Sequence, residues 1–138
     1  MNEFRAAVEA QDLERLVALL DEDVVFRSPV VFKPYRGRDQ AAVVLAAVAR
    51  VFEDFRYERE IGAAGAPDHA LVFTARVGDR ELEGCDFLHT NGAGLIDELV
   101  VMVRPLSAAL ALVEGMKAEL APAETEAGGH SPSRAHNS

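Results

Sequence analysis

Asp86 is the residue of this chain whose type and setting best suit acid–base chemistry. It lies in the stretch ELEGCDFLHTNGAG (residues 81–94), whose alternating pattern predicts a β-strand followed by a tight turn. A carboxyl group among apolar side chains loses its hydration, and this loss raises its pKa because the charged form depends most on water. Such an acid can stay protonated near neutral pH and donate a hydrogen bond.

The turn that precedes this strand determines which way Asp86 points. The dipeptide Gly-Asp at 78–79 suits a two-residue hairpin, which would pair Leu71 with Asp86. The same register places Arg76 directly across from Glu81, where the two could form an ion pair. Asp86 then shares its face with apolar side chains: Leu71, Phe73, Ala75, Leu82 and Leu88. Asp86 is therefore expected to face an interior or a pocket, unless a bulge reverses the strand.

Two interpretations of this buried carboxyl stay open. It is either the working acid of a pocket or a structural aspartate, hydrogen-bonded to a backbone amide or to a buried tyrosine. A perturbed carboxyl occurs in both settings, so the residue type alone does not separate them.

The composition limits the classes of partner. The 138 residues include 14 Lys and Arg against 23 Asp and Glu, which gives a net charge of -9. Nucleic acids and anionic membrane surfaces recruit clusters of basic side chains, so neither is expected as a partner. No apolar run is long enough to span a membrane and no signal peptide is recognisable, so a cytoplasmic location is expected.

Helical and strand periodicities follow one another in an order that predicts an α+β fold. A first helix carries Phe4, is continuous or bent near Gln11, and leads to a helix that Asp12 would cap. An extended stretch and a helix over 40–55 follow, and the periodicity then changes to that of strands. Separate groups of helices and antiparallel strands indicate α+β rather than a doubly wound sheet.

The ordered domain is predicted to span residues 1–121 and to close with a helix. From Pro122 onward the chain loses its bulky apolar side chains and cannot bury enough surface to offset its ordering entropy. Residues 122–138 are therefore predicted to form a disordered tail.

Two stretches of the chain resemble one known superfamily. The segments AQDLERLVALLDEDVVFRSPVVFKPYRGRD (10–39) and GCDFLHTNGAGLIDELVV (84–101) are similar to the NTF2-like superfamily in its SnoaL-like and ketosteroid-isomerase branches. The resemblance covers roughly residues 3–105. It implies a cone-shaped fold in which helices pack into a strongly curved antiparallel sheet around an apolar pocket.

The resemblance assigns three positions of the isomerase site. The protonated aspartic acid of the oxyanion hole falls on Asp86, shortly before the shared NGAG turn. The proton-shuttling aspartate falls on Ser28, and the tyrosine donor of the first helix falls on Phe4. A serine hydroxyl is too weak a base for an α-carbon proton, and phenylalanine cannot donate a hydrogen bond. Isomerase chemistry by the usual residues is therefore not expected, although the pocket is.

The predicted ligand pocket combines Asp86 with a mostly apolar wall. The wall residues expected from the register and the resemblance are Phe4, Phe26, Ser28, Tyr35, Phe52, Phe73, Leu99 and Val101. Ser28 also suits a simple bend before a proline, and Tyr35 also suits packing over the sheet edge. No metal and no cofactor is expected, because the chain has one cysteine, Cys85, and its histidines lack ligands at metal spacing.

The last strand also predicts a partner. If Leu99 and Val101 line the pocket, Val100 and Met102 lie on the outer face of the sheet. Apolar side chains on an open face need covering, so a homodimer through this face is expected.

Three functions follow from these patterns. The first is binding, with possible conversion by cofactor-free acid-assisted isomerisation, cyclisation, hydration or hydrolysis, of a steroid-, polyketide- or terpene-like molecule. The second is a non-catalytic ligand-binding or dimerisation module, which the residues at Ser28 and Phe4 favour. The third, an epoxide hydrolase of the limonene type, needs an Asp-Arg-Asp set, and the apolar face offers one carboxylate and no arginine.

Overall fold

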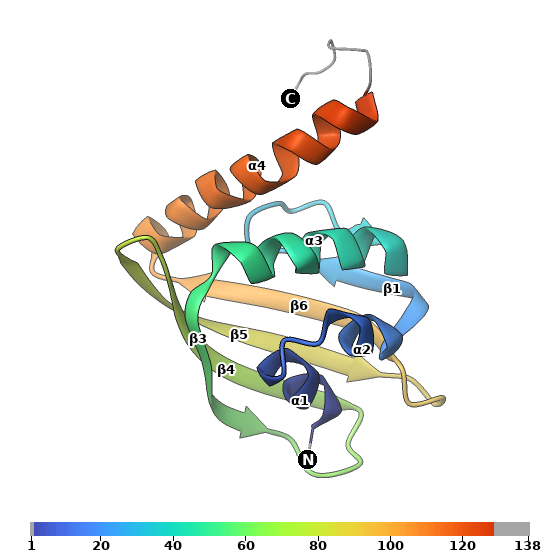
Figure 1. The fold of residues 1–138 in the computed structure, drawn as a ribbon. Coiled ribbons are helices and arrows are strands. Elements are labelled where there is room, and N and C mark those ends of the chain that lie inside the picture. The colour runs from blue at the N-terminus through green and yellow to red at the C-terminus, as the bar shows by residue number, and fades with distance from the viewer. Residues whose placement is uncertain (1, 129–138) are drawn as a thin grey trace.

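The computed structural model describes residues 2–128 and shows an α+β fold (Figure 1). Within these residues the chain forms four helices: α1 (Glu3–Glu9), α2 (Leu13–Ala18), α3 (Arg38–Val51) and α4 (Leu106–Gly128). Six strands form one sheet: β1 (Leu20–Arg27), β2 (Tyr35–Arg36), β3 (Glu53–Ile61), β4 (Asp68–Val77), β5 (Arg80–Thr90) and β6 (Ile96–Arg104). None of the helices in the described part of the chain is long and apolar enough to cross a membrane.

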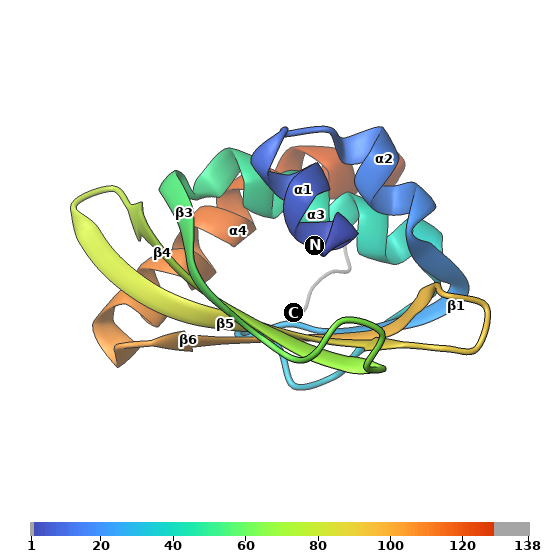
Figure 2. The same cartoon turned by 90° about the horizontal axis from the view of Figure 1, so that it is seen from below.

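The sheet is strongly curved, and helices cover one of its two faces. The strand order is β2-β1-β6-β5-β4-β3, in which β1 and β6 are parallel and all other neighbours are antiparallel. Figure 2 shows α1, α2 and α3 over the concave face, whereas the convex face carries no helix along β4, β5 and β6. The predicted α+β cone with a curved sheet is therefore confirmed, with one parallel pair of strands inside it.

The hairpin of β4 and β5 has the predicted register. Val77 lies opposite Arg80 and Leu71 lies opposite Asp86, with no shift along the ladder. Asp86 consequently points to the concave face. Arg76 does lie opposite Glu81, but its guanidinium instead forms ion pairs with two acids of β3, at 2.7 Å from Glu53 Oε1 and 2.7 Å from Asp54 Oδ2.

The first two helices are separated by a sharp bend rather than joined. Asp12 caps α2 as predicted, because its carboxylate accepts a hydrogen bond from the backbone N–H of Arg15 at 3.1 Å. The preceding Gln11 has a φ of 55°, which turns the chain between α1 and α2. This bend folds the two short helices against each other over the concave face (Figure 2).

Two helix ends differ from the sequence prediction. Helix α3 ends at Val51, not near residue 55, because Phe52 adopts an extended conformation and β3 begins at Glu53. Helix α4 continues to Gly128, past the predicted domain end at 121. The alanines and glutamates of that extension favour a helix, whereas Pro122 and Gly128 do not. The remainder of the predicted tail, 129–138, lies outside the described residues.

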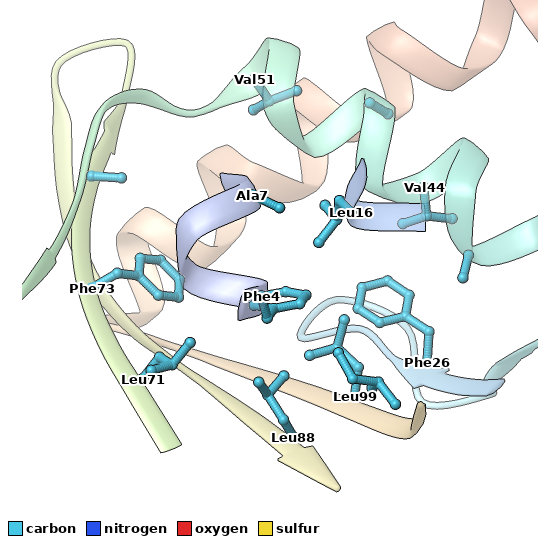
Figure 3. Packing of buried hydrophobic residues seen from close by; sticks show 14 of the residues in the cluster. Phe4, Ala7, Leu16, Phe26, Val44, Val51, Leu71, Phe73, Leu88 and Leu99 are labelled. Atoms are coloured by element: carbon cyan, nitrogen blue, oxygen red, sulfur yellow. The ribbon is translucent and has the colours of Figure 1, made fainter. Parts of the chain in front are cut away.

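The core fills the space between the concave face and the helices. Figure 3 shows Phe4 of α1, Phe26 of β1, Phe73 of β4 and Leu99 of β6 pointing toward this common interior. Phe73 is also stacked against Phe55 of β3, with ring centroids 4.7 Å apart. These contacts tie the outer strands of the sheet to the helix layer.

Gly84 of β5 makes room for the ring of Phe73. The two residues lie opposite each other in the ladder, and a Cβ added at Gly84 would overlap the ring, 2.8 Å from both Cε atoms. Because Phe73 is only 1% exposed and is held by other rings, it cannot move aside freely. Position 84 therefore requires glycine, because the ring of Phe73 lies too close to the β5 backbone to leave room for a Cβ.

We predict that Gly84→Ala lowers the free energy of unfolding by about 1–3 kcal/mol, the usual cost of overpacking a filled core. Urea denaturation measures the change. Gly92→Ala is the matched control, because a Cβ at Gly92 would meet no atom within 4 Å. Equal stability of the two variants would contradict the close packing of Phe73 on Gly84.

Candidate functional site

A cavity of about 660 Å³ lies between the concave face of the sheet and the helices. Its size is within the usual range of small-ligand sites. Asp86 and seven of the eight predicted wall residues line it: Phe4, Phe26, Ser28, Phe52, Phe73, Leu99 and Val101. The eighth, Tyr35, is not among the lining residues. It lies on the two-residue strand β2 and stacks on Phe26, with ring centroids 6.1 Å apart.

Asp86 is the one charged residue in the part of the chain described here that is classed as buried, with 7% of its surface exposed. Its Oδ2 accepts a hydrogen bond from the hydroxyl of Tyr57 at 2.7 Å. No other hydrogen bond to the Asp86 carboxyl is formed by residues 2–120, whose side chains the structure describes. Since each carboxyl oxygen can accept more than one hydrogen bond, Asp86 retains unused capacity beside the cavity.

Burial controls the acid–base behaviour of this pair. Loss of hydration raises the pKa of Asp86 to about 7, and the hydrogen bond from Tyr57 opposes this rise. The pKa of the Tyr57 hydroxyl is raised above its ordinary value, first by burial and then by the neighbouring Asp86. Near neutral pH the aspartate is therefore divided between its neutral and ionised forms, while Tyr57 keeps its proton.

Tyr57 is held by an aromatic layer and by an arginine. It comes from β3, is 6% exposed, and packs edge-on against Phe55 with ring centroids 4.9 Å apart. The guanidinium of Arg5 in α1 lies 5.8 Å from the centre of the tyrosine ring, at cation–π distance. Arg5 itself is anchored by ion pairs with Glu9 at 3.0 Å and Glu60 at 3.5 Å.

A buried tyrosine is one of the partners expected for Asp86, but the sequence pattern does not indicate that this tyrosine is Tyr57. Tyr57 lies opposite Phe73 in the β3–β4 ladder, two positions along β4 from Leu71, the partner of Asp86. The alternation of Phe55 and Tyr57 is visible in the sequence. However, the register of β3 shifts on both sides of Tyr57. Counting residues along an uninterrupted ladder therefore would not have put Tyr57 opposite Phe73.

Ser28 and Phe4 occupy the two positions that the resemblance assigns to a base and to a tyrosine. Neither side chain supplies the chemistry of the group it replaces. Ser28 lines the cavity, and its Oγ accepts a hydrogen bond from the N–H of Val30 at 3.0 Å, as in a bend. Phe4 is 3% exposed and contributes only apolar surface. A general base of ordinary strength is therefore absent from both positions.

Both histidines in the described part of the chain, His69 and His89, lie apart from the cavity. His89 Nδ1 is 2.7 Å from an oxygen of Asp97, and this contact raises the pKa of His89. His69 Nε2 is 3.0 Å from the carbonyl oxygen of Ala63. Among the side chains of residues 2–120, no three His, Cys, Asp or Glu gather in a way that could hold a metal ion.

Comparison with known proteins places this fold in one class. The SnoaL-like domain model matches residues 1–99. A steroid delta-isomerase from Pseudomonas aeruginosa is 42% identical, with 88% of each chain covered and a TM-score of 0.83. A bacterial protein with a cystatin-like fold from Silicibacter pomeroyi is 36% identical, with 91% of this chain and 88% of that chain covered and a TM-score of 0.83.

A more distant NTF2-like protein from Burkholderia xenovorans shares the fold at 21% identity, with 79% of this chain and 89% of that chain covered and a TM-score of 0.61. Among curated proteins none matches the chain. The chain belongs to the SnoaL-like domain family, and its structure is an NTF2-like cone.

We predict that Asp86→Asn stabilises the protein increasingly as the pH rises. The folded-state pKa of about 7 lies above the value of about 3.9 for an unfolded aspartate, so the folded state holds the extra proton between these pH values. Stability is therefore lost as the pH rises from about 4 to 7, by up to about 4 kcal/mol. Asparagine cannot ionise, and its amide oxygen can still accept the hydrogen bond from Tyr57.

Urea unfolding of both proteins between pH 4 and 8 measures this difference. The exposed Asp79→Asn in the β4–β5 turn controls for the removal of one negative charge, and its effect should not grow over this pH range. If the advantage of Asp86→Asn over wild type stayed constant or shrank with rising pH, the raised pKa would be wrong.

Proposed function

We propose that this protein binds a small hydrophobic molecule, of steroid-, polyketide- or terpene-like character, in the cavity, with Asp86 as its polar anchor. The observation that carries the proposal is a buried carboxyl in an apolar cavity wall, with one side-chain partner and spare hydrogen-bonding capacity. A ligand oxygen is the group that best completes its hydrogen bonding. The 42% identical steroid delta-isomerase supports the same class of ligand.

The chemistry available to this site is that of a neutral acid. In its protonated form Asp86 can donate a hydrogen bond to a carbonyl, ether or epoxide oxygen of the ligand, while Tyr57 holds its other oxygen. The donor then stabilises negative charge that develops on the ligand oxygen, without a cofactor. Isomerisation, cyclisation, hydration and hydrolysis all contain such a step.

A second candidate function is binding without conversion. It is favoured by Ser28, whose hydroxyl is engaged by the N–H of Val30, and by Phe4, which cannot donate a hydrogen bond. Deuterium exchange next to the carbonyl of bound progesterone in D2O separates the two functions. Exchange above the uncatalysed rate supports catalysis, and binding without exchange supports a carrier.

We predict that wild-type protein binds progesterone, a neutral steroid ketone, and that Val48→Phe weakens this binding about tenfold or more. Val48 of α3 lines the cavity, so the larger ring would occupy the space that the ligand needs. Calorimetric titration measures the affinity. Val43→Phe, on the same helix but 54% exposed, is the matched control and should bind like wild type.

The convex face of the sheet supports a second proposal, a homodimer. Two apolar rows cross the strands there: Ala70, Phe87 and Val100 in one, and Val72, Cys85 and Met102 in the other. Met102 is 58% exposed and Phe87 is 40% exposed. On either side of these rows an acid pairs with a base, Glu98 with Arg27 and Glu83 with Arg104, so two copies can approach without like-charge repulsion.

We predict a wild-type mass of two chains in solution and a mass of one chain for Met102→Glu, because the new carboxylate would be desolvated at the centre of the interface. Light scattering coupled to size exclusion measures both masses. Val43→Glu is the control, because Val43 is 54% exposed on α3, which covers the opposite, concave face of the sheet. A monomeric wild type would overturn the homodimer.

The cytoplasmic location stays a prediction.

A further inference from the structure

The cavity wall has charge of one sign only. Its ionisable acids are Asp12, Asp54 and Asp86, and no lysine, arginine or histidine is among the lining residues. From this distribution we propose that the cavity admits uncharged hydrophobic molecules and excludes their carboxylate, sulfate and phosphate forms. The inference rests on the proposed ligand-binding function and adds to it the chemical class of the ligand.

Asp86 provides the strongest discrimination because it lies in the cavity wall and is almost fully buried. An anionic ligand group beside it would face either a second negative charge or a proton shared between two acids. In a site with little water such repulsion is screened much less than at a surface. An uncharged alcohol or ketone can instead form a hydrogen bond with Asp86 in either protonation state.

The acids near the mouth act in the same direction, although unequally. Asp12 caps α2, where the backbone N–H of Arg15 and the N-terminal end of the helix offset part of its charge, and it forms no ion pair within residues 2–120. Asp54 is neutralised in part by Arg76, at 2.7 Å. The rim therefore adds a weaker negative potential to that of the buried acid.

The arginines close to the cavity are not available to bind an anion. Arg5 lies over the Tyr57 ring, does not line the cavity, and is held by Glu9 and Glu60. Arg76 is held by two acids of β3, each at 2.7 Å. Recruiting either guanidinium for a ligand would break two ion pairs and leave their carboxylates unpaired.

The ligand class follows from this arrangement. A free alcohol, ketone, ether or lactone on a hydrophobic skeleton fits, whereas the corresponding acid or its sulfate or phosphate ester does not. The reaction that supplies the ligand must therefore release an unconjugated product, for example by removing a charged group or by closing a carboxylate into a lactone.

Three fluorescent probes with one skeleton test the proposal: 1-pyrenemethanol, 1-pyrenemethylamine and 1-pyrenecarboxylate. At pH 8 we expect the carboxylate to bind about tenfold or more weakly than the alcohol, and clearly more weakly than the ammonium form of the amine. The amine controls for the cost of desolvating any charge. The difference between acid and amine therefore reports the sign of the potential in the cavity.

Two further measurements assign the effect to the cavity acids. In wild type, the preference for the amine over the acid should increase between pH 6 and 8, because Asp86 ionises over this range. The other ionisable side chains of the cavity wall are Tyr57, Asp12 and Asp54. In Asp86→Asn the preference should be smaller and independent of pH over this range. The pH series needs no variant, so it remains decisive if Asp86→Asn fails to fold.

The outcomes separate this inference from the function on which it rests. Equal affinity for acid and amine at pH 8, or tighter binding of the acid, would overturn charge selection while leaving the hydrophobic binding site intact. Failure of all three probes to bind saturably would count against the binding function itself. A preference for the amine that is the same in wild type and in Asp86→Asn would refute the role given to Asp86.

Discussion

The burial of one carboxyl group is the constraint on which the rest of this structure depends. An aspartate removed from water is costly unless it is neutral or hydrogen-bonded, and Asp86 meets this requirement through a pKa near 7 and the hydroxyl of Tyr57. The two side chains come from β5 and β3, with β4 between them. Their meeting therefore requires the sheet to curve, so that side chains on non-adjacent strands converge over its concave face (Figure 2).

The same curvature explains why the interior is a cavity and not a filled core. Helices α1, α2 and α3 span the concave face and touch the sheet mainly through large rings and branched side chains (Figure 3). Phe52, Phe55 and Phe73 form a continuous aromatic layer at one end. Gly84 leaves the room that this layer needs. Between this layer, the helices and Asp86 lies the cavity of about 660 Å³.

The sequence was most informative where the structure is local and periodic. The Gly-Asp turn and strict alternation were sufficient to place Leu71 opposite Asp86, and that single register put the acid on the correct face. It was least informative where periodicity breaks. The end of α3 at Val51 and the shifts of β3 around Tyr57 depend on aromatic packing between distant segments, which no local pattern encodes. Tyr35 follows the second of its two expected roles, because it stacks on Phe26 and is not among the residues that line the cavity.

The position of the tyrosine hydroxyl changes what the site can do. The resemblance implies a tyrosine on the first helix, where this chain has Phe4. The tyrosine of this site is instead Tyr57 on β3, and its hydroxyl donates a hydrogen bond to Asp86. A hydroxyl engaged in that way orients Asp86 and lowers its pKa, but it does not reach independently for a ligand. The ligand therefore meets one buried carboxyl, which is an acid when protonated and a base when ionised, and both forms are present near neutral pH. Because one carboxyl cannot be acid and base at the same moment, a reaction that needs both must take the second group from water, from the ligand, or from Asp12 or Asp54 of the cavity wall.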